Sequence, residues 1–191
     1  MAEKLELLVE DNPFLTEKVI RKANSKNSRI LFLYPNERGM STIPPSIAVL
    51  SQILKDEGHV TGLFDTTFYK FDDEISIEDS DKIKSNALEN RPVLDRDDDD
   101  LHFKKTTKSA IDDFRKAILN FRPDLIAVSC TETTFLRAIK MIDATRDLGI
   151  KNIFGGVFPT FAPELALSYE NVDMVCVGEG ENAIVDLANS M

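Results

Sequence analysis

The chain has 191 residues, a formal net charge of −10, 42% hydrophobic residues and 29% charged residues. This length suffices for one domain with its own core. Because Lys and Arg are scattered and outnumbered by Asp and Glu, we expect no nucleic-acid partner. The sequence has no apolar run of about 18 residues and no basic-then-apolar leader, which predicts no membrane span, no signal peptide and a cytoplasmic location.

The first regular segments alternate between strand and helix patterns. Residues 29–34 (Arg-Ile-Leu-Phe-Leu-Tyr) form a nearly continuous apolar run, typical of a strand buried on both faces of a parallel sheet. Apolar residues at helical spacing then predict a helix over 47–54 that ends at Gly58. Residues 59–64 indicate a second, weaker strand.

Two stretches lie outside this alternation. Residues 1–27 are predicted to form an N-terminal helical extension. Residues 72–104 are predicted to be an acidic, flexible insertion within an α/β domain that spans 28–191. A calcium loop in the Asp-rich run at 95–100 is disfavoured, because that run lacks the turn Gly and the closing Glu of such loops.

The same alternation returns in the second half of the chain. The patterns predict strands at 125–128, 152–154 and 174–177, and helices at 111–121, 135–142, 161–168 and 182–189. We expect Thr106 or Thr107 to cap the helix at 111–121. Five strand–helix units predict a three-layer, doubly wound α/β fold of the Rossmann-like or flavodoxin-like kind, with a five-stranded parallel sheet in the order 2-1-3-4-5.

A fold of this kind binds its ligand outside the carboxyl ends of the strands, where the strand order reverses. The loops at that edge are rich in glycines, which let the backbone approach a flat ligand, and in hydroxyls at a helix start, where a phosphate binds. The candidate cofactor-binding residues are Pro35, Gly39, Ser129, Thr131, Thr133, Gly155, Gly156, Phe158, Gly178, Glu179 and Gly180. Purely structural roles remain open, as turn glycines and as a helix cap.

The sequence predicts no catalytic residue and no metal ligand in this chain. Cys130 and Cys176 follow or end predicted strands and are expected to be buried, inert thiols. His59 and His102 are expected to have surface or structural roles.

Several segments together carry a resemblance to a known family. They are residues 123–129 (Pro-Asp-Leu-Ile-Ala-Val-Ser), 155–160 (Gly-Gly-Val-Phe-Pro-Thr) and 172–181 (Val-Asp-Met-Val-Cys-Val-Gly-Glu-Gly-Glu). Over about residues 28–190 the chain resembles the N-terminal cobalamin (vitamin B12)-binding domain of cobalamin-dependent radical-SAM enzymes. These include enzymes labelled anaerobic magnesium-protoporphyrin IX monomethyl ester oxidative cyclase.

The resemblance implies that the cofactor is cobalamin. Classical cobalamin domains carry Asp-x-His-x-x-Gly after the first strand, and its His ligates cobalt. Residues 35–42 read Pro-Asn-Glu-Arg-Gly-Met-Ser-Thr here, without a His. As in the radical-SAM members, the resemblance therefore implies a histidine-off cobalt.

The resemblance also implies a longer parent enzyme. A radical-SAM domain holds a [4Fe-4S] cluster with three cysteines in a Cys-x-x-x-Cys-x-x-Cys motif, which this chain lacks. We therefore expect a truncated module that is not catalytic alone. Its C-terminal partner domain would hold the iron–sulfur cluster and S-adenosylmethionine, in an oxidoreductase or a methyltransferase.

Other functions of the same fold are weighed against this one. A vestigial flavodoxin-like domain would bind no cofactor, act as a docking or structural unit, and fill the space above the strand ends with Phe158, Glu37 and Arg38. A phospho-receiver is disfavoured, because the strand ends do not carry the acidic residues and the Lys that it needs. A flavodoxin would need a phosphate loop richer in Ser and Thr after the first strand.

Overall fold

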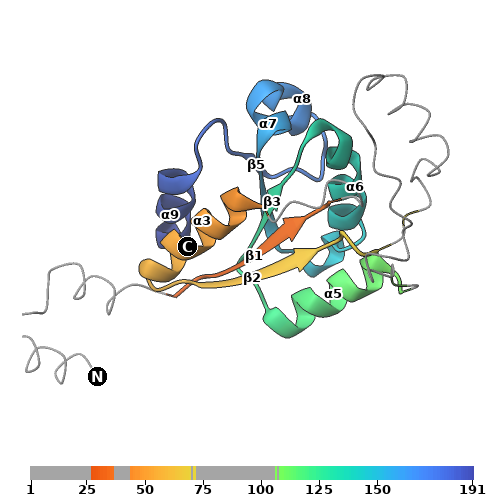
Figure 1. The fold of residues 1–191 in the computed structure, drawn as a ribbon, viewed down its shortest axis with the longest axis horizontal. Helices are drawn as coiled ribbons and strands as arrows, with labels where there is room; N and C mark the ends of the chain where they lie inside the picture. The colour runs from red at the N-terminus through yellow and green to blue at the C-terminus, as the bar shows by residue number, and fades with distance from the viewer. Residues whose placement is uncertain (1–26, 37–43, 70, 72–105, 107) are drawn as a thin grey trace, which may run out of the picture.

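A five-stranded parallel sheet forms the centre of the computed structural model, which describes residues 27–36, 44–69, 71, 106 and 108–191 (Figure 1). The predicted insertion at 72–104 and the predicted N-terminal extension, apart from its last residue, lie outside the described residues. So do Gly39, Glu37, Arg38 and His102.

The described elements follow one another as the apolar patterns predict. They are β1 (Arg29–Tyr34), α3 (Pro45–Asp56), β2 (Val60–Asp65), α5 (Ala110–Phe121), β3 (Leu125–Ser129), α6 (Glu132–Asp143), the 3-10 helix η2 (Arg146–Leu148), β4 (Lys151–Gly155), α7 (Val157–Phe161), α8 (Pro163–Leu167), β5 (Met174–Val175) and α9 (Glu181–Ser190).

The strand order is β2-β1-β3-β4-β5 and every pairing is parallel, which confirms the predicted order 2-1-3-4-5. Tyr34 pairs with Asp65 at the end of β1 and β2, and Ser129 pairs with Gly155 at the end of β3 and β4. Neighbouring strands therefore finish level with each other, and the loops that follow them emerge along one edge.

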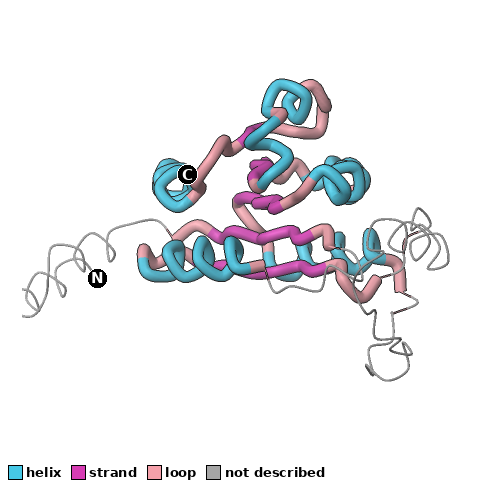
Figure 2. Tube along the Cα trace, turned by 45° about the horizontal axis from the view of Figure 1, so that its top comes forward, coloured by secondary structure: helices cyan, strands magenta, loops and turns pink. Residues whose placement is uncertain are grey.

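Helices cover both faces of the sheet, with α3 and α9 on one face and α5 and α6 on the other (Figures 1 and 2). Successive residues of β1 point to opposite faces, so Ile30 and Phe32 join the core under α3 and α9, whereas Leu31 and Leu33 join the core under α5 and α6. Both sets are buried, which is why the strand has a continuous apolar sequence.

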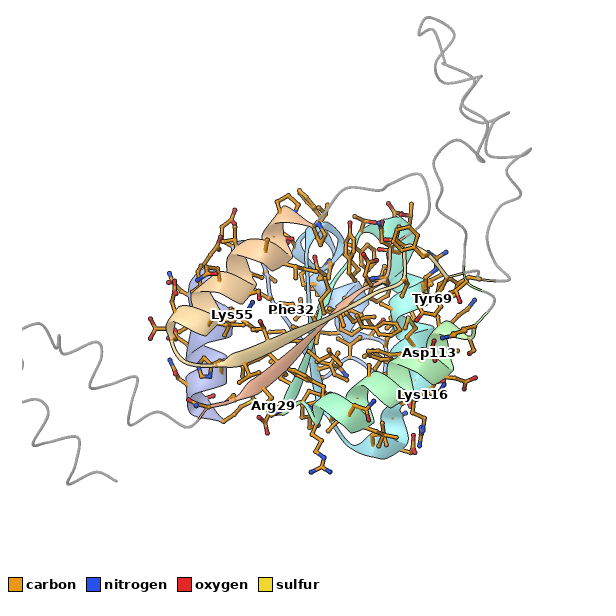
Figure 3. All side chains as sticks on the ribbon, turned by 60° about the horizontal axis from the view of Figure 1, so that its bottom comes forward. Arg29, Phe32, Lys55, Tyr69, Asp113 and Lys116 are labelled. Atoms are coloured by element: carbon orange, nitrogen blue, oxygen red, sulfur yellow. The ribbon has the colours of Figure 1, made fainter. Side chains whose placement is uncertain are left out.

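Polar side chains on the outer surface of α5 bind the connection that follows β2. In Figure 3 the labelled Tyr69 lies beside Asp113 and Lys116 of α5, while Lys55 belongs to α3 on the other face. The Tyr69 hydroxyl donates to Asp113 Oδ2 at 3.2 Å, and Lys116 Nζ donates to Asp113 Oδ1 at 3.0 Å. The connection after β2 is thereby attached to α5. None of the described helices has the length and apolar character needed to cross a membrane.

The predicted cap of α5 is wrong for Thr106, and Thr107 lies outside the described residues. Ser109 caps the helix instead, and its hydroxyl accepts the Asp112 N–H at 3.2 Å. Thr106 forms an isolated bridge with Tyr69. A cap must stand directly before the first helical residue, so the helix start at Ala110 selects Ser109.

The helix predicted over residues 161–168 is the shorter α8 (Pro163–Leu167), and a second short helix, α7 (Val157–Phe161), precedes it where a loop was predicted. They are separated at Ala162, which has φ −133° and ψ 55°. The cause is Pro163, because a proline ring disfavours the helical conformation of the residue before it. The last strand is also shorter than the predicted 174–177, since only Met174 and Val175 pair with β4.

Candidate functional site

The loops that follow β3, β4 and β5 meet at the carboxyl edge of the sheet. The Cys130 N–H donates to the carbonyl of Gly155 at 3.1 Å, which joins the first two loops. The Gly178 N–H donates to Thr160 Oγ1 at 3.1 Å, which joins the third loop to α7. The structure therefore brings together the predicted site residues of these three loops.

Gly156 sits where only a glycine fits. Its φ is 100° and its ψ is −164°, a region that side chains exclude. A Cβ at this position would lie 2.6 Å from the Cys130 carbonyl oxygen and 3.1 Å from the Cys130 nitrogen. The Gly155-Gly156 segment is therefore pressed against the backbone that begins the loop after β3.

Gly178 also has a positive φ, of 80°, but its surroundings are open. A Cβ built there would meet nothing within 4 Å. Glu179 beside it is exposed, and Gly180 lies against Leu50 of α3, whose Cδ2 would be 3.6 Å from an added Cβ. The loop after β5 is therefore exposed at Gly178 and Glu179 and packs against α3 at Gly180.

The hydroxyls after β3 form the start of α6. The Thr131 N–H donates to Thr134 Oγ1 at 3.0 Å, and Thr131 Oγ1 lies 3.1 Å from Thr133 Oγ1. The structural role as a helix cap is therefore present. Thr133 is exposed, and Ser129 and Thr131 are half-buried, so these hydroxyls also line the edge. Thr134, the buried partner, belongs to the same hydroxyl cluster at the helix start but is not among the candidate cofactor-binding residues.

The loop after β1 leaves the sheet from a buried polar cluster. Pro35 is fully buried, and the carbonyl of Asn36 accepts hydrogen bonds from Thr66 Oγ1 at 2.9 Å and from Arg137 Nη1 at 3.1 Å. The Arg137 guanidinium also lies 4.3 Å from the centre of the Phe71 ring. This cluster ties the end of β1 to β2 and α6.

Arg137 is the residue in this cluster that sequence reasoning most clearly missed. Only 4% of it is exposed. It stands on α6 at helical spacing from Thr134 and Met141, both of which are buried. The available signal was therefore a charged residue inside the apolar stripe of a helix.

Phe158 of α7 is half-buried and packs against the core. Its ring packs against Phe135 of α6, with 4.5 Å between the ring centres, and it borders the core under α5 and α6. The vestigial-domain alternative expected Phe158, Glu37 and Arg38 to fill the space above the strand ends; Glu37 and Arg38 lie outside the described residues, so that expectation stays a prediction. Any contact between Phe158 and a ligand at the edge stays a prediction.

The two cysteine thiols favour their protonated forms. Burial raises the pKa of Cys130 to about 12. Burial also raises the pKa of Cys176, and the nearby carboxylate of Glu181 adds to the shift. Both thiols therefore stay neutral near pH 7. The prediction that both are buried is right for Cys130 and wrong for Cys176, which is only partly buried because it follows the two-residue strand β5 at the sheet edge. The described residues contain no group of three or more His, Cys, Asp or Glu side chains that could hold a metal ion.

A polar hollow of about 240 Å³ lies at the opposite edge of the sheet, beside Lys151 and Asp173. Lys151 Nζ donates to Asp173 Oδ1 at 2.6 Å, and Asp173 Oδ2 accepts from both the backbone and the side chain of Asn152. These bonds hold the start of β4. Asn171 also lines the hollow, where its Nδ2 donates to Asp143 Oδ1 at 2.9 Å and its buried Oδ1 has no hydrogen-bond partner among the described residues. The candidate cofactor-binding residues lie at the other edge, where the strands end.

Comparison with known proteins gives a consistent set of similarities. A family model described as "B12 binding domain" matches residues 36–188. No curated protein matches the chain.

Solved structures with the same fold come from larger enzymes. Two structures of the radical S-adenosylmethionine methyltransferase TsrM from Kitasatospora setae are each 18% identical to the chain. One contains a tryptophan substrate and a SAM analog; its TM-score is 0.56, with 85% of this chain and 25% of that chain covered. The other contains cobalamin and a [4Fe-4S] cluster; its TM-score is 0.57, with 86% and 24% covered.

A third similar structure is the apo form of OxsB, a cobalamin-dependent S-adenosylmethionine radical enzyme. It is 18% identical, with a TM-score of 0.55, and the match covers 86% of this chain and 19% of that chain. The chain therefore spans a quarter or less of the length of these three structures. At this identity the likeness to them establishes the fold alone.

Proposed function

We propose, since the chain belongs to the B12-binding domain family, that the carboxyl edge of its sheet binds cobalamin. The observation that carries the proposal is the family match over residues 36–188, which includes all three loops gathered at that edge. The function is that of a binding module: it holds and orients a cofactor whose chemistry is completed elsewhere.

The residues at the edge fit a large, flat cofactor. β3 and β4 end in the small residues Ser129 and Gly155, and the loop after β5 offers the open backbone of Gly178. We propose that these residues, with Thr131, Thr133, Gly156, Glu179 and Gly180, hold cobalamin mainly through backbone and hydroxyl groups. Bound cobalamin supplies a cobalt centre for methyl-transfer or radical chemistry.

We propose that the bound cobalt has no protein histidine ligand. The loop after β1 has no His in its sequence. His59 is buried at the opposite edge, where its ring contacts Ser28 and Asn189.

We further propose that the chain works as part of a radical-SAM enzyme of the oxidoreductase or methyltransferase type. The fold is shared with the TsrM and OxsB structures, of whose chains the match covers only 19–25%. In this proposal a C-terminal domain supplies the S-adenosylmethionine site and the [4Fe-4S] cluster. The oxidoreductase version of this proposal is an enzyme like the anaerobic magnesium-protoporphyrin IX monomethyl ester cyclases, which the sequence resembles.

A titration of the purified chain with hydroxocobalamin tests the central claim. We expect saturable uptake with a shifted visible spectrum, and coelution of cofactor and protein on a sizing column. We expect 15N labelling of the chain's histidines to leave the electron paramagnetic resonance spectrum of the cobalt(II) form unchanged. Absence of uptake at about 100 μM ligand, far above an expected micromolar Kd, would contradict the proposal. A spectrum that changes with this label would contradict only the histidine-off part.

A further inference from the structure

Thr160 connects two segments of the edge that are far apart in the sequence. Its hydroxyl donates to the carbonyl of Gly156 at 2.8 Å, and it accepts the N–H of Gly178 at 3.1 Å. A threonine hydroxyl has one donor hydrogen and two acceptor positions, so it can make both bonds at the same time. The residue was not among the candidates drawn from the sequence.

The two bonds differ in what they indicate. A bond from a helical threonine to the carbonyl four residues earlier is an ordinary local feature. The bond with Gly178 is not local, because Gly178 lies 18 residues further along the chain, in the loop after another strand. This second bond makes Thr160 a link between the β4 and β5 loops.

The loop after β5 has little else to define its position near Gly178. β5 is only two residues long, and its last backbone bond to β4 runs from the Cys176 N–H to the Phe154 carbonyl, at 2.8 Å. Beyond that point, an added Cβ at Gly178 would meet open space, so tight packing does not hold this residue. The hydrogen bond from its N–H to Thr160 therefore sets its distance from Gly156.

The segments on either side of Thr160 suit one part of the proposed ligand. Gly155-Gly156 and Gly178-Glu179-Gly180 follow two neighbouring parallel strands, β4 and β5. The nucleotide tail, with a planar base and a phosphate, is the part of a large cofactor narrow enough to lie between two such segments. We infer that Thr160 is a positioning residue that holds these two glycine segments at the spacing needed for the nucleotide tail of cobalamin. This inference rests on the proposed function.

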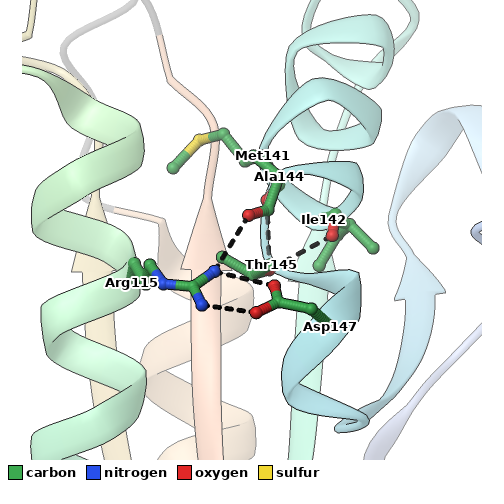
Figure 4. A network of polar contacts seen from close by, with 6 residues as sticks. All are labelled: Arg115, Met141, Ile142, Ala144, Thr145 and Asp147. Atoms are coloured by element: carbon green, nitrogen blue, oxygen red, sulfur yellow. Dashed lines mark hydrogen bonds and ion pairs between the residues drawn. The ribbon is translucent and has the colours of Figure 1, made fainter.

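Two ligands and two positions test the inference. Cobinamide has the corrin ring without the nucleotide tail, so comparing it with cobalamin isolates binding of the tail. Thr160→Val removes the hydroxyl and keeps the shape, whereas Thr160→Ser keeps the hydroxyl. Thr145→Val is the matched control, because the Thr145 hydroxyl donates to Met141 and Ile142 carbonyls, each at 3.1 Å, at the opposite edge (Figure 4).

The Kd values for both ligands are measured by visible-spectrum titration of each variant. For Thr160→Val we expect cobalamin binding to weaken about ten-fold and cobinamide binding to change less than about two-fold, since a hydrogen-bonded link is lost only at the tail. We expect Thr160→Ser to restore the wild-type preference for cobalamin over cobinamide. We expect Thr145→Val to leave that preference unchanged.

The outcomes separate this inference from the proposed function. If the wild-type chain binds cobalamin and Thr160→Val binds it equally well, the positioning role is overturned and the cobalamin site stands. An equal loss for both ligands would assign Thr160 a general structural role and would also overturn the inference. If the wild-type chain binds neither ligand, the proposed function itself fails. Thr160→Ala repeats the measurement should the valine variant fail to fold.

Discussion

Gly156 and Gly178 are both glycines in loops that follow strands, but they are required for different reasons. Gly156 lies against the backbone of Cys130, with no room for a Cβ, whereas Gly178 borders open space. Both have positive φ. At Gly156 the missing side chain allows two loops to touch, and at Gly178 it allows only the turn of the chain.

This difference predicts unequal costs for the same substitution. Gly156→Ala should lower the free energy of unfolding by about 3 kcal/mol, because it adds a backbone clash to the conformational strain. Gly178→Ala should cost about 1 kcal/mol, from the strain alone. Urea unfolding curves of the two variants measure both values. Equal losses would show that the contact with Cys130 is not what restricts Gly156.

An ion pair joins α5 to η2, the short helix that follows α6 on the same face of the sheet. Arg115 of α5 forms a two-pronged pair with Asp147 of η2, and its Nη1 also donates to the Ala144 carbonyl at 3.4 Å (Figure 4). The hydrogen bonds from the guanidinium hold the pKa of Asp147 below its ordinary value of 3.8. The carboxylate correspondingly raises the pKa of Arg115.

The lowered pKa of Asp147 gives the ion pair a defined pH dependence. Because the folded state favours the charged carboxylate, the stabilisation is present above pH 3.8 and is lost as the pH falls through the lower folded-state value. We expect Asp147→Asn to lower the melting temperature slightly at pH 7, and the difference to shrink as the pH falls below 3.8 and the carboxylate becomes protonated.

Melting curves over this pH range, at low and high salt, measure the effect. Both side chains are substantially exposed, so salt should reduce the difference seen at pH 7. A gap between variant and wild type that persists at the acidic end would mean that Asp147 acts through something other than its charge.

At the scale of the whole molecule, the two ends of the described α/β domain meet around one histidine. The Ser28 N–H donates to Nδ1 of His59 at 3.2 Å, so the other ring nitrogen carries the hydrogen and faces Asn189 Oδ1 at 3.1 Å. The Ser28 hydroxyl donates to the Ala188 carbonyl at 2.8 Å. These bonds join the start of β1, the start of β2 and the end of α9.

We expect His59→Ala to lower the free energy of unfolding by about 2–3 kcal/mol, because it leaves the buried Ser28 N–H without a partner and opens a cavity. Asn189 is exposed, so Asn189→Ala should cost less than about 1 kcal/mol. Chemical unfolding of both variants gives the comparison. A cost for Asn189→Ala as large as that for His59→Ala would place the main contribution in the side-chain pair rather than in the bond to Ser28.

Local sequence patterns were sufficient to predict the architecture, because buried residues recur at the period of the strand or helix that contains them. The apolar runs at 29–34 and 125–128 predicted β1 and β3, and the alternation with helices predicted the sheet order. The glycine motifs at 155–156 and 178–180 indicated which edge to examine. The binding roles of the candidate residues remain predictions.

What the sequence by itself determined was thus the order of the elements, the parallel sheet and the edge where its loops gather. The tertiary structure alone decided which groups meet there: Thr160 with Gly178, Arg137 with Asn36, and the Phe158 ring with the core. The reason is physical. Hydrophobic periodicity reports whether a residue is buried, whereas a hydrogen bond between distant loops depends on strand register and on the path of each turn, which no local pattern records.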